Sequence, residues 1–230
     1  MRIIIVPDVH GRPFWRKVLT NKEDTIVFLG DYSDPYEFVE GYTHEEAIYE
    51  LTDIVQFKKE NRERVILLLG NHDAGYIDYK FISCRYSVKL YNEYHRLFTE
   101  DPNLFQMAYS ITINDIDYLF THAGVSPKWL SGHHLAFTAD ALNKAWLEKP
   151  NVFNEVGLMR GGKYMVGSPI WIDAEEHDSV SPYVQIFGHT QQEENPYINW
   201  NMWCLDCRKV FILEDGKIEE YKEQSWNVRL

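Results

Sequence analysis

Residues 25–36 read T-I-V-F-L-G-D-Y-S-D-P-Y, so an apolar run enters a glycine and is followed at once by two carboxylates. The run Thr25–Leu29 has no polar position after its first residue, which predicts a strand buried on both faces. Asp31 and Asp34 then lie three positions apart, and carboxylates that close repel each other unless positive charge lies beside them. The stretch therefore predicts a cation next to these aspartates. It leaves open why Pro35 follows them, where a cationic side chain would help to hold an anion.

Two similar runs flank this strand in the sequence. Arg2–Val6 and Arg64–Leu69 are short, rich in isoleucine, valine or leucine, and do not alternate, as expected of strands buried on both faces. Thr43–Asn61 predicts a helix, because Thr43 and Glu46 form a capping box ahead of an apolar stripe. This part of the chain follows a β-α-β rhythm.

Later helices and strands predict a layered architecture. Two more helices are expected over Arg85–Phe98 and Ala136–Glu148. After Gln106 the pattern predicts a mostly antiparallel second half with strands at 109–113, 117–121, 183–187, 201–207 and 209–213. Strand-helix alternation followed by a meander favours two sheets packed face to face with helices outside, an α/β fold.

The composition favours one domain. The chain has 230 residues, 45% of them hydrophobic, and no proline-, glycine- or serine-rich stretch divides it. We therefore expect a single domain over 1–230. It would hold a helical insertion around 74–106 and a loop-rich segment around 150–182.

Charge and cysteine content limit the function classes. The net charge of -12 would repel a phosphate backbone, so no long nucleic acid is expected as a partner. Divalent ions can still reverse the field locally. No apolar run approaches the length of a membrane helix, and an odd number of cysteines fits a reducing compartment, so we expect no membrane partner and a cytoplasmic location. Cys204 and Cys207 are interpreted as core residues of a strand.

Polar side chains follow the ends of several predicted strands in sharp turns that contain or adjoin glycine. Such turns present sites at the carboxyl ends of strands in α/β sheets. A single aspartate or histidine after a strand is usually a capping or turn residue, but five strand ends that are all followed by such residues indicate a site. These blocks hold Asp8 and His10, Asp31 and Asp34, Asn71, His72 and Asp73, His122, and His189.

The ligand types point to divalent metal ions. Aspartate, histidine and asparagine without a thiolate suit manganese, iron or zinc. The set exceeds the needs of one ion, whereas two ions about 3.5 to 4 Å apart that share one carboxylate would use all of it. Asp31 would then lie between two cations, and such a pair clamps the attacking and leaving oxygens of phosphoryl transfer.

These five blocks, in this order, resemble the calcineurin-like metallophosphoesterase family. The wording G-D-Y-S-D, F-T-H-A-G, V-Q-I-F-G-H-T and C-L-D-C is similar to its phosphoprotein-phosphatase branch. The resemblance spans Arg2 to about Phe211. It implies a four-layer αββα sandwich of two mixed β-sheets flanked by helices.

The resemblance also implies roles for individual residues. His72 would be the general acid near the leaving group, and Asp34 would orient it. The first metal would be held by Asp8, His10 and Asp31, and the second by Asp31, Asn71, His122 and His189. The two divalent ions would be manganese, iron or both, with zinc as an alternative.

The sequence departs from the branch pattern at three positions. Pro35 and Leu69 stand where the branch has arginines that bind phosphate, and Gln191 stands where some relatives have a further histidine. We therefore expect other phosphate donors. Arg160 in a glycine-rich loop is the first candidate, because a guanidinium can form two hydrogen bonds to phosphate, and Asn71 would assist.

The predicted activity is hydrolysis of a phosphomonoester by attack of a metal-bridging hydroxide, with His72 as general acid. The substrate would be a small molecule or a peptide-borne phosphate. A phosphodiesterase or nucleotide hydrolase is the alternative within enzymes, although the net charge and the absence of a basic stripe disfavour a nuclease. A non-catalytic metal-binding scaffold is a third alternative, against which the presence of both His72 and Asp34 argues.

Overall fold

The strands that carry the predicted site belong to a mixed six-stranded sheet. The computed structural model describes residues 1–18, 21–177 and 180–222. The sheet order is β11-β10-β1-β2-β3-β4. Strands β1 to β4 run parallel to one another, β10 pairs antiparallel with β1, and β11 pairs antiparallel with β10. Its strands are β1 (Arg2–Val6), β2 (Thr25–Phe28), β3 (Val65–Leu68), β4 (Phe105–Gln106), β10 (Phe211–Glu214) and β11 (Lys217–Glu220).

A second, five-stranded sheet has the order β5-β6-β7-β9-β8. It is mixed, because β6, β7 and β9 run parallel to one another while β5 and β8 pair antiparallel with their neighbours. The expectation of a mostly antiparallel second half holds for four of the six pairs that involve strands after Gln106, whereas β6–β7 and β7–β9 are parallel. Its strands are β5 (Ala108–Ile113), β6 (Ile116–Thr121), β7 (Val184–Phe187), β8 (Tyr197–Asn199) and β9 (Met202–Cys204).

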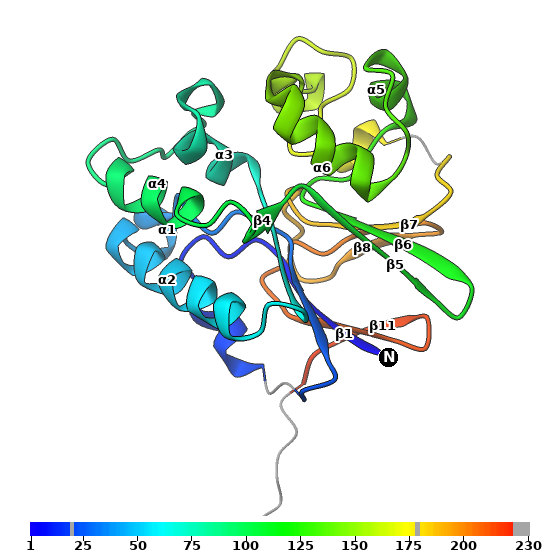
Figure 1. Ribbon diagram of the computed structural model, residues 1–230, viewed down its shortest axis with the longest axis horizontal. Coiled ribbons are helices and arrows are strands. Elements are labelled where there is room, and N and C mark those ends of the chain that lie inside the picture. The colour runs from blue at the N-terminus through cyan, green and yellow to red at the C-terminus, as the bar shows by residue number, and fades with distance from the viewer. Residues whose placement is uncertain (19–20, 178–179, 223–230) are drawn as a thin grey trace, which may run out of the picture.

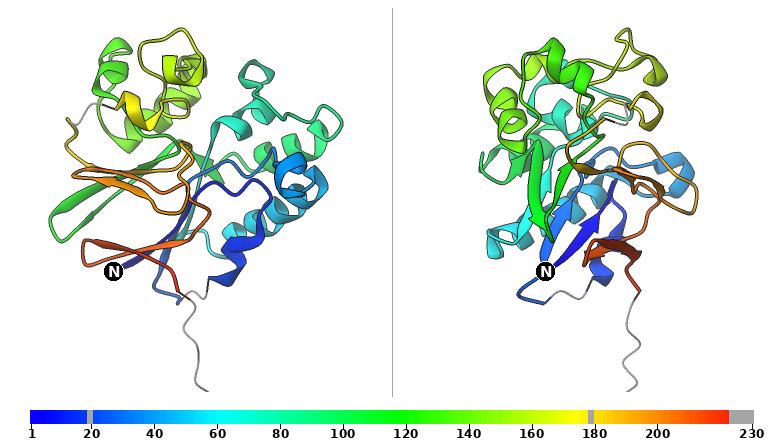
Figure 2. Two further views of the ribbon diagram at one scale, coloured as in Figure 1. Left: turned by 180° about the vertical axis from the view of Figure 1, so that it is seen from behind. Right: turned by 90° about the vertical axis from the view of Figure 1, so that its right-hand side faces the viewer.

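Helices cover the outer faces of both sheets (Figures 1 and 2). Helices α1, α2 and α4 lie outside the six-stranded sheet, and α5 and α6 lie over the five-stranded sheet. The predicted αββα sandwich is confirmed. The helices are α1 (Glu37–Glu40), α2 (His44–Glu60), α3 (Asn71–Ile77), α4 (Tyr91–Thr99), α5 (Pro127–Gly132) and α6 (Ala139–Glu148), with 3-10 turns at Pro13–Lys17, Tyr79–Phe81, Pro150–Asn154, Leu158–Arg160 and Ala174–Glu176.

Alternate residues of β1 serve two different cores. Ile3 and Ile5 face the second sheet and pack in a cluster with Phe120 and Trp203. Ile4 and Val6 belong to the cluster on the other face of the sheet, which includes residues of α2. Because both faces of β1 are buried, its sequence shows a continuous apolar run without alternation.

Two predicted elements are shorter than expected. The helix predicted over Arg85–Phe98 begins only at Tyr91, and the strand predicted over 201–207 ends at Cys204. Cys204 and Cys207 are both buried, as expected of core residues. In the described part of the chain, no helix combines the length and the hydropathy that a membrane span requires. The predicted ranges 1–230 and 150–182 include residues that lie outside the described part.

Candidate metal centre and active site

The five sequence blocks meet at one edge of the two packed sheets. Parallel strands place their carboxyl ends at the same edge. The blocks that contain Asp8, Asp31 and Asn71 follow β1, β2 and β3 of the first sheet, and those that contain His122 and His189 follow β6 and β7 of the second. The fold therefore gathers side chains that are more than 180 residues apart in sequence.

Two glycines make room for the carboxylates in this gathering. A Cβ atom at Gly70 would collide with Asp31 Oδ1, and a Cβ atom at Gly188 would collide with Asp8 Oδ1. Each glycine directly precedes a predicted ligand, so glycine is required where one loop approaches the carboxylate of another.

Asp31 lies at the centre of the site. Its Oδ2 atom is 3.5 Å from His10 Nε2 and 3.5 Å from His122 Nε2. Two groups of potential metal ligands share this carboxylate: His10, Asp31 and His72 form one, and Asp31, His122 and His189 form the other. The ligand atoms of each group lie within 4.8 Å of one another.

The other predicted ligands adjoin these groups. Asn71 Oδ1 is 3.0 Å from His122 Nε2, and His189 Nδ1 is 3.1 Å from the same nitrogen. The Asp8 carboxylate accepts a hydrogen bond of 3.0 Å from the backbone N–H of His189. The structure therefore brings all six predicted metal ligands into one buried cluster.

The electrostatics of the cluster fit divalent cations. Burial, with repulsion from Asp206, raises the pKa of Asp8 well above its usual range, and burial also raises the pKa of Asp31 to about 7. Burial lowers the pKa of His10 and of His189 well below the usual histidine value. The cluster thus joins carboxylates that are costly to ionise with imidazoles that stay neutral. A cation would stabilise both forms, because it binds carboxylates and imidazole lone pairs.

A second, adjacent unit joins His72 to Asp34. The Nδ1 atom of His72 lies 2.8 Å from Asp34 Oδ2, and the Tyr76 hydroxyl donates to Asp34 Oδ1. Burial lowers the pKa of His72, but the negative charges of Asp31 and Asp34 outweigh this effect and raise the pKa to about 10. In the metal-free protein these charges favour the protonated form of His72. Its Nδ1 atom contacts Asp34, and its Nε2 atom lies 3.3 Å from Arg85 Nη2.

Two residues of the site, Asp73 and Arg85, have a role that the sequence patterns did not predict. Asp73 is fully buried and accepts hydrogen bonds from the backbone N–H groups of Asp31 and Gly70, at 2.7 and 3.0 Å, so it ties the loop after β2 to the loop after β3. Its position in the block G-N-H-D, directly after Asn71 and His72, could have indicated that it belongs to the site. Arg85 lies 3.3 Å from His72 Nε2 through its Nη2 atom, and no motif marks it.

Several site residues adopt a left-handed backbone. Non-glycine residues rarely take positive φ values, and they do so mainly where the surrounding structure imposes the conformation, often at functional sites. Here such values recur around the metal ligands and the acid. They occur at His10 (45°), Asp31 (52°), Asp34 (54°), His189 (64°) and Arg85 (65°).

Arg160, predicted to bind substrate, lies beside the His189 loop. Its Nη2 atom donates to the carbonyl of His189 at 2.9 Å and to the hydroxyl of Thr190 at 3.0 Å. Its Nε atom lies 2.8 Å from Asp173 Oδ2. Gln191 is exposed. The guanidinium is therefore close to a predicted metal ligand and already contacts three groups of the protein.

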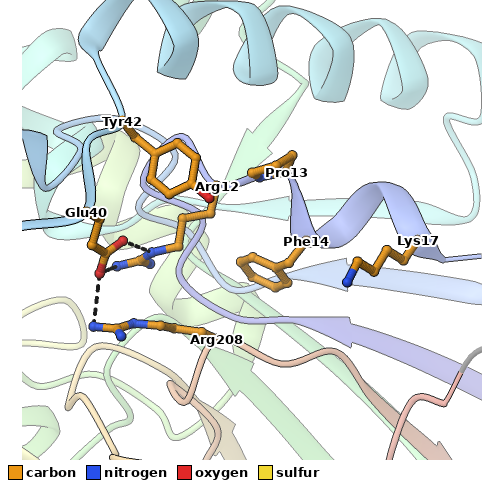
Figure 3. A pocket seen from close by; sticks show the side chains of 7 residues that line it. All are labelled: Arg12, Pro13, Phe14, Lys17, Glu40, Tyr42 and Arg208. Atoms are coloured by element: carbon orange, nitrogen blue, oxygen red, sulfur yellow. Dashed lines mark hydrogen bonds and ion pairs between the residues drawn. The ribbon is translucent and has the colours of Figure 1, made fainter.

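A cavity of about 520 Å³ opens beside the Asp8 loop (Figure 3). Glu40 accepts hydrogen bonds from Arg12 there and forms an ion pair of 2.9 Å with Arg208. Arg12 also donates to the Asp8 carbonyl at 3.2 Å. The cavity is lined by Arg12, Pro13, Phe14, Lys17, Glu40, Tyr42 and Arg208.

The chain belongs to the calcineurin-like phosphoesterase family, whose family model matches residues 1–193. The fold and the cluster of metal-ligand candidates agree with that family of metal-dependent phosphoester hydrolases. No curated protein matches the chain.

Solved structures share the fold at low sequence identity. A cold-active protein-tyrosine phosphatase of a psychrophilic Shewanella species is 17% identical, with a TM-score of 0.59 over 96% of this chain and 80% of that one. A protein serine/threonine phosphatase from Saccharomyces cerevisiae is 16% identical, with a TM-score of 0.51 over the same shares of the two chains.

Proposed function

We propose that the protein hydrolyses a phosphomonoester at a dinuclear metal site. The observation that supports this most directly is the position of Asp31, whose carboxylate is shared by two groups of ligand atoms, one of which contains His72, the partner of Asp34. A mononuclear site would not need a shared carboxylate, and a metal-binding scaffold would not need a protonated histidine beside the ligands.

The proposed ligand sets use the whole cluster. The first metal is held by Asp8, His10 and Asp31, and the second by Asp31, Asn71, His122 and His189. Oxygen and imidazole ligands suit manganese or iron, with zinc as an alternative. When bound, two such ions lower the pKa of water and offset the charge of the phosphoryl oxygens.

His72 then acts as the general acid. Its Nδ1–H donates to Asp34, so the proton for the leaving oxygen is carried by Nε2, the ring nitrogen that borders Arg85. Tyr76 donates to the other oxygen of Asp34, which fixes the carboxylate and hence the direction of the imidazole. A general acid in this position protonates the leaving group as its bond to phosphorus breaks.

The substrate is a phosphomonoester of a small molecule or a peptide. Asn71 and Arg160 are proposed to contact it, Asn71 from the second metal position and Arg160 from the His189 loop. Long nucleic acid is disfavoured, because the net charge of -12 leaves little to neutralise a phosphate backbone.

The test is hydrolysis of p-nitrophenyl phosphate and of bis(p-nitrophenyl) phosphate by the manganese-loaded protein. The proposal expects the monoester to be cleaved faster. Asp31→Asn should lower turnover on the order of 100-fold or more and reduce the bound metal. Preference for the bis-ester would favour a phosphodiesterase. Metal binding without turnover of either ester would favour a scaffold.

A further inference from the structure

We propose that Arg85 is a further phosphate-binding arginine of this protein and that it sets a preference for dianionic monoesters over diesters. This inference rests on the proposed function and assigns one further residue to it. Its starting point is the position of the guanidinium, whose Nη2 atom lies 3.3 Å from His72 Nε2. The proposed general acid and this cation therefore border the same space.

Arg85 differs from the other arginines near the site in its ion pairing. Three other arginines near the site form ion pairs with carboxylates: Arg12 and Arg208 with Glu40, and Arg160 with Asp173. Over residues 1–18, 21–177 and 180–222, Arg85 has no carboxylate within ion-pairing distance. Removing an arginine side chain from water without a carboxylate partner costs free energy unless an anion binds it. Phosphate suits this role, because a guanidinium can donate two parallel hydrogen bonds to its oxygens.

The protein holds Arg85 in a fixed orientation. Its Nε atom donates to the Asp34 carbonyl at 2.9 Å, and its guanidinium lies over the ring of Tyr36, 3.8 Å from the ring centroid. His44 Nε2 lies 3.0 Å from the Arg85 carbonyl oxygen, and the backbone is in the left-handed region with φ 65°. These contacts direct a long, flexible side chain, so little entropy is left to lose when an anion binds.

An anion can reach this guanidinium. Arg85 lines a cavity of about 240 Å³ together with the loop that contains Pro35 and Tyr36. Pro35 is buried at the wall of this cavity, and Leu69 is buried in the core, so neither position can supply a donor. Arg85, in the segment between α3 and α4, borders this cavity and also lies 3.3 Å from His72 through its Nη2 atom.

A guanidinium here would favour monoesters on electrostatic grounds. A monoester dianion has one more charged oxygen than a diester, and that oxygen has to be neutralised in a site where desolvation strengthens each interaction. Arg85 lies at the Nε2 atom of His72, and His72 belongs to the same group of ligand atoms as His10 and Asp31. The cation therefore adds binding for the oxygen that only a monoester carries.

The experiment compares Arg85→Ala and Arg85→Lys with the wild type, all three loaded with manganese. Arg85→Ala should lower kcat/KM for p-nitrophenyl phosphate about 10- to 100-fold, while kcat/KM for the bis-ester changes by less than about threefold. Arg85→Lys should recover part of the monoester activity, because lysine keeps the positive charge but cannot donate two parallel hydrogen bonds to phosphate. Arg96→Ala is the matched control, since Arg96 is an exposed arginine of α4 that pairs with Glu100.

Equilibrium binding of inorganic phosphate separates this inference from the proposed function. Calorimetry on the metal-loaded proteins should show phosphate binding weakened about tenfold or more by Arg85→Ala, with the metal content unchanged. Unchanged phosphate affinity, or equal losses on both esters, would overturn the role of Arg85. If the wild type binds phosphate through Arg85 but cleaves neither ester, the proposed function fails and the anion site remains.

Discussion

Asp31 acts through three of its atoms at once. Its Oδ2 atom lies between His10 and His122, its Oδ1 atom accepts from the backbone N–H of His72 at 3.0 Å, and its own N–H donates to Asp73. Its φ of 52° aims the carboxylate into the cluster. A substitution at this position therefore changes the direction of the His72 loop as well as the proposed metal sites.

The proposed role of His72 predicts a dependence on the leaving group. His72→Ala should leave metal content unchanged and slow alkyl phosphates about 10²- to 10⁴-fold, but slow p-nitrophenyl phosphate far less, because only a poor leaving group needs a proton in the transition state. Steady-state kinetics over a series of leaving groups would measure this.

Asp34→Asn is the companion variant. It keeps the size of the side chain and removes the charge that raises the pKa of His72, so it should show the same pattern in a milder form. An equal loss on every ester for both variants would assign the pair to phosphate binding.

Arg160 has a role that the sequence predicts and that its contacts make testable. If it binds substrate, Arg160→Ala should raise KM for a phosphomonoester about 10-fold and weaken inhibition by phosphate, with metal content unchanged. Lys163→Ala, in the same glycine-rich loop, is the control. A loss of bound metal would instead mean that Arg160 positions His189, whose carbonyl it contacts. Unchanged kinetics would make it an ordinary loop residue.

At the scale of elements, an ion pair joins α1 to the loop after β1, because Glu40, the last residue of α1, pairs with Arg12. Glu40 is the principal partner of Arg12, whose side chain is 7% exposed. Glu40→Ala should destabilise the protein by about 2 to 3 kcal/mol. This loss is smaller than for a fully enclosed ion pair, because water in the cavity can solvate the unpaired Arg12. Urea denaturation would measure the free energy of unfolding.

Glu37→Ala provides the control for that variant. Glu37 lies at the start of the same helix and is exposed. Its loss should change the free energy of unfolding by about 0.5 kcal/mol or less. Equal effects of the two substitutions would show that α1 itself, and not the Arg12–Glu40 pair, determines the loss.

Elements stabilised by local signals were predictable from the sequence. The capping box of Thr43 and Glu46 starts α2 as expected, and the apolar runs gave β1, β2 and β3 to within a residue at each end. The polar residues that follow those runs were predictable as a cluster, because parallel strands place their carboxyl ends together.

Elements shaped by distant contacts were not predictable. Arg85–Leu90 has the apolar spacing of a helix, but His44 contacts the Arg85 carbonyl, and the Ser87 N–H donates to the Tyr76 hydroxyl. These contacts use backbone groups that a helix would need, so α4 begins at Tyr91. The same long-range contacts place Arg85 at the site, where no local pattern could have indicated it.

At the scale of the whole molecule, the buried charges make stability depend on pH. The folded pKa of His72 is raised to about 10, above its value in an unfolded chain. Its contribution to stability is therefore fully present below pH 6.5 and is lost as the pH rises through 10. The chelator-treated protein should lose a few kcal/mol of unfolding free energy between pH 7.5 and 10.

His72→Gln isolates this contribution. Urea denaturation of the metal-free variant should show a flatter pH dependence than the metal-free wild type. Manganese should also flatten the wild-type curve, because cations at Asp31 offset a charge that raises the pKa of His72. Parallel curves for wild type and variant would mean that other groups cause the loss.

The pairing of β1 with β10 has a consequence for biosynthesis. Arg2–Ile5 pair with Phe211–Glu214, so one edge of an isoleucine-rich central strand is covered by a hairpin made roughly 200 residues later. At about 5 to 20 residues per second, that edge stays open on the ribosome for about 10 to 40 s. An uncovered apolar strand edge recruits other chains during that time. We therefore expect chaperones that shield nascent chains to raise the yield of this protein, because they would cover the β1 edge until the C-terminal hairpin emerges.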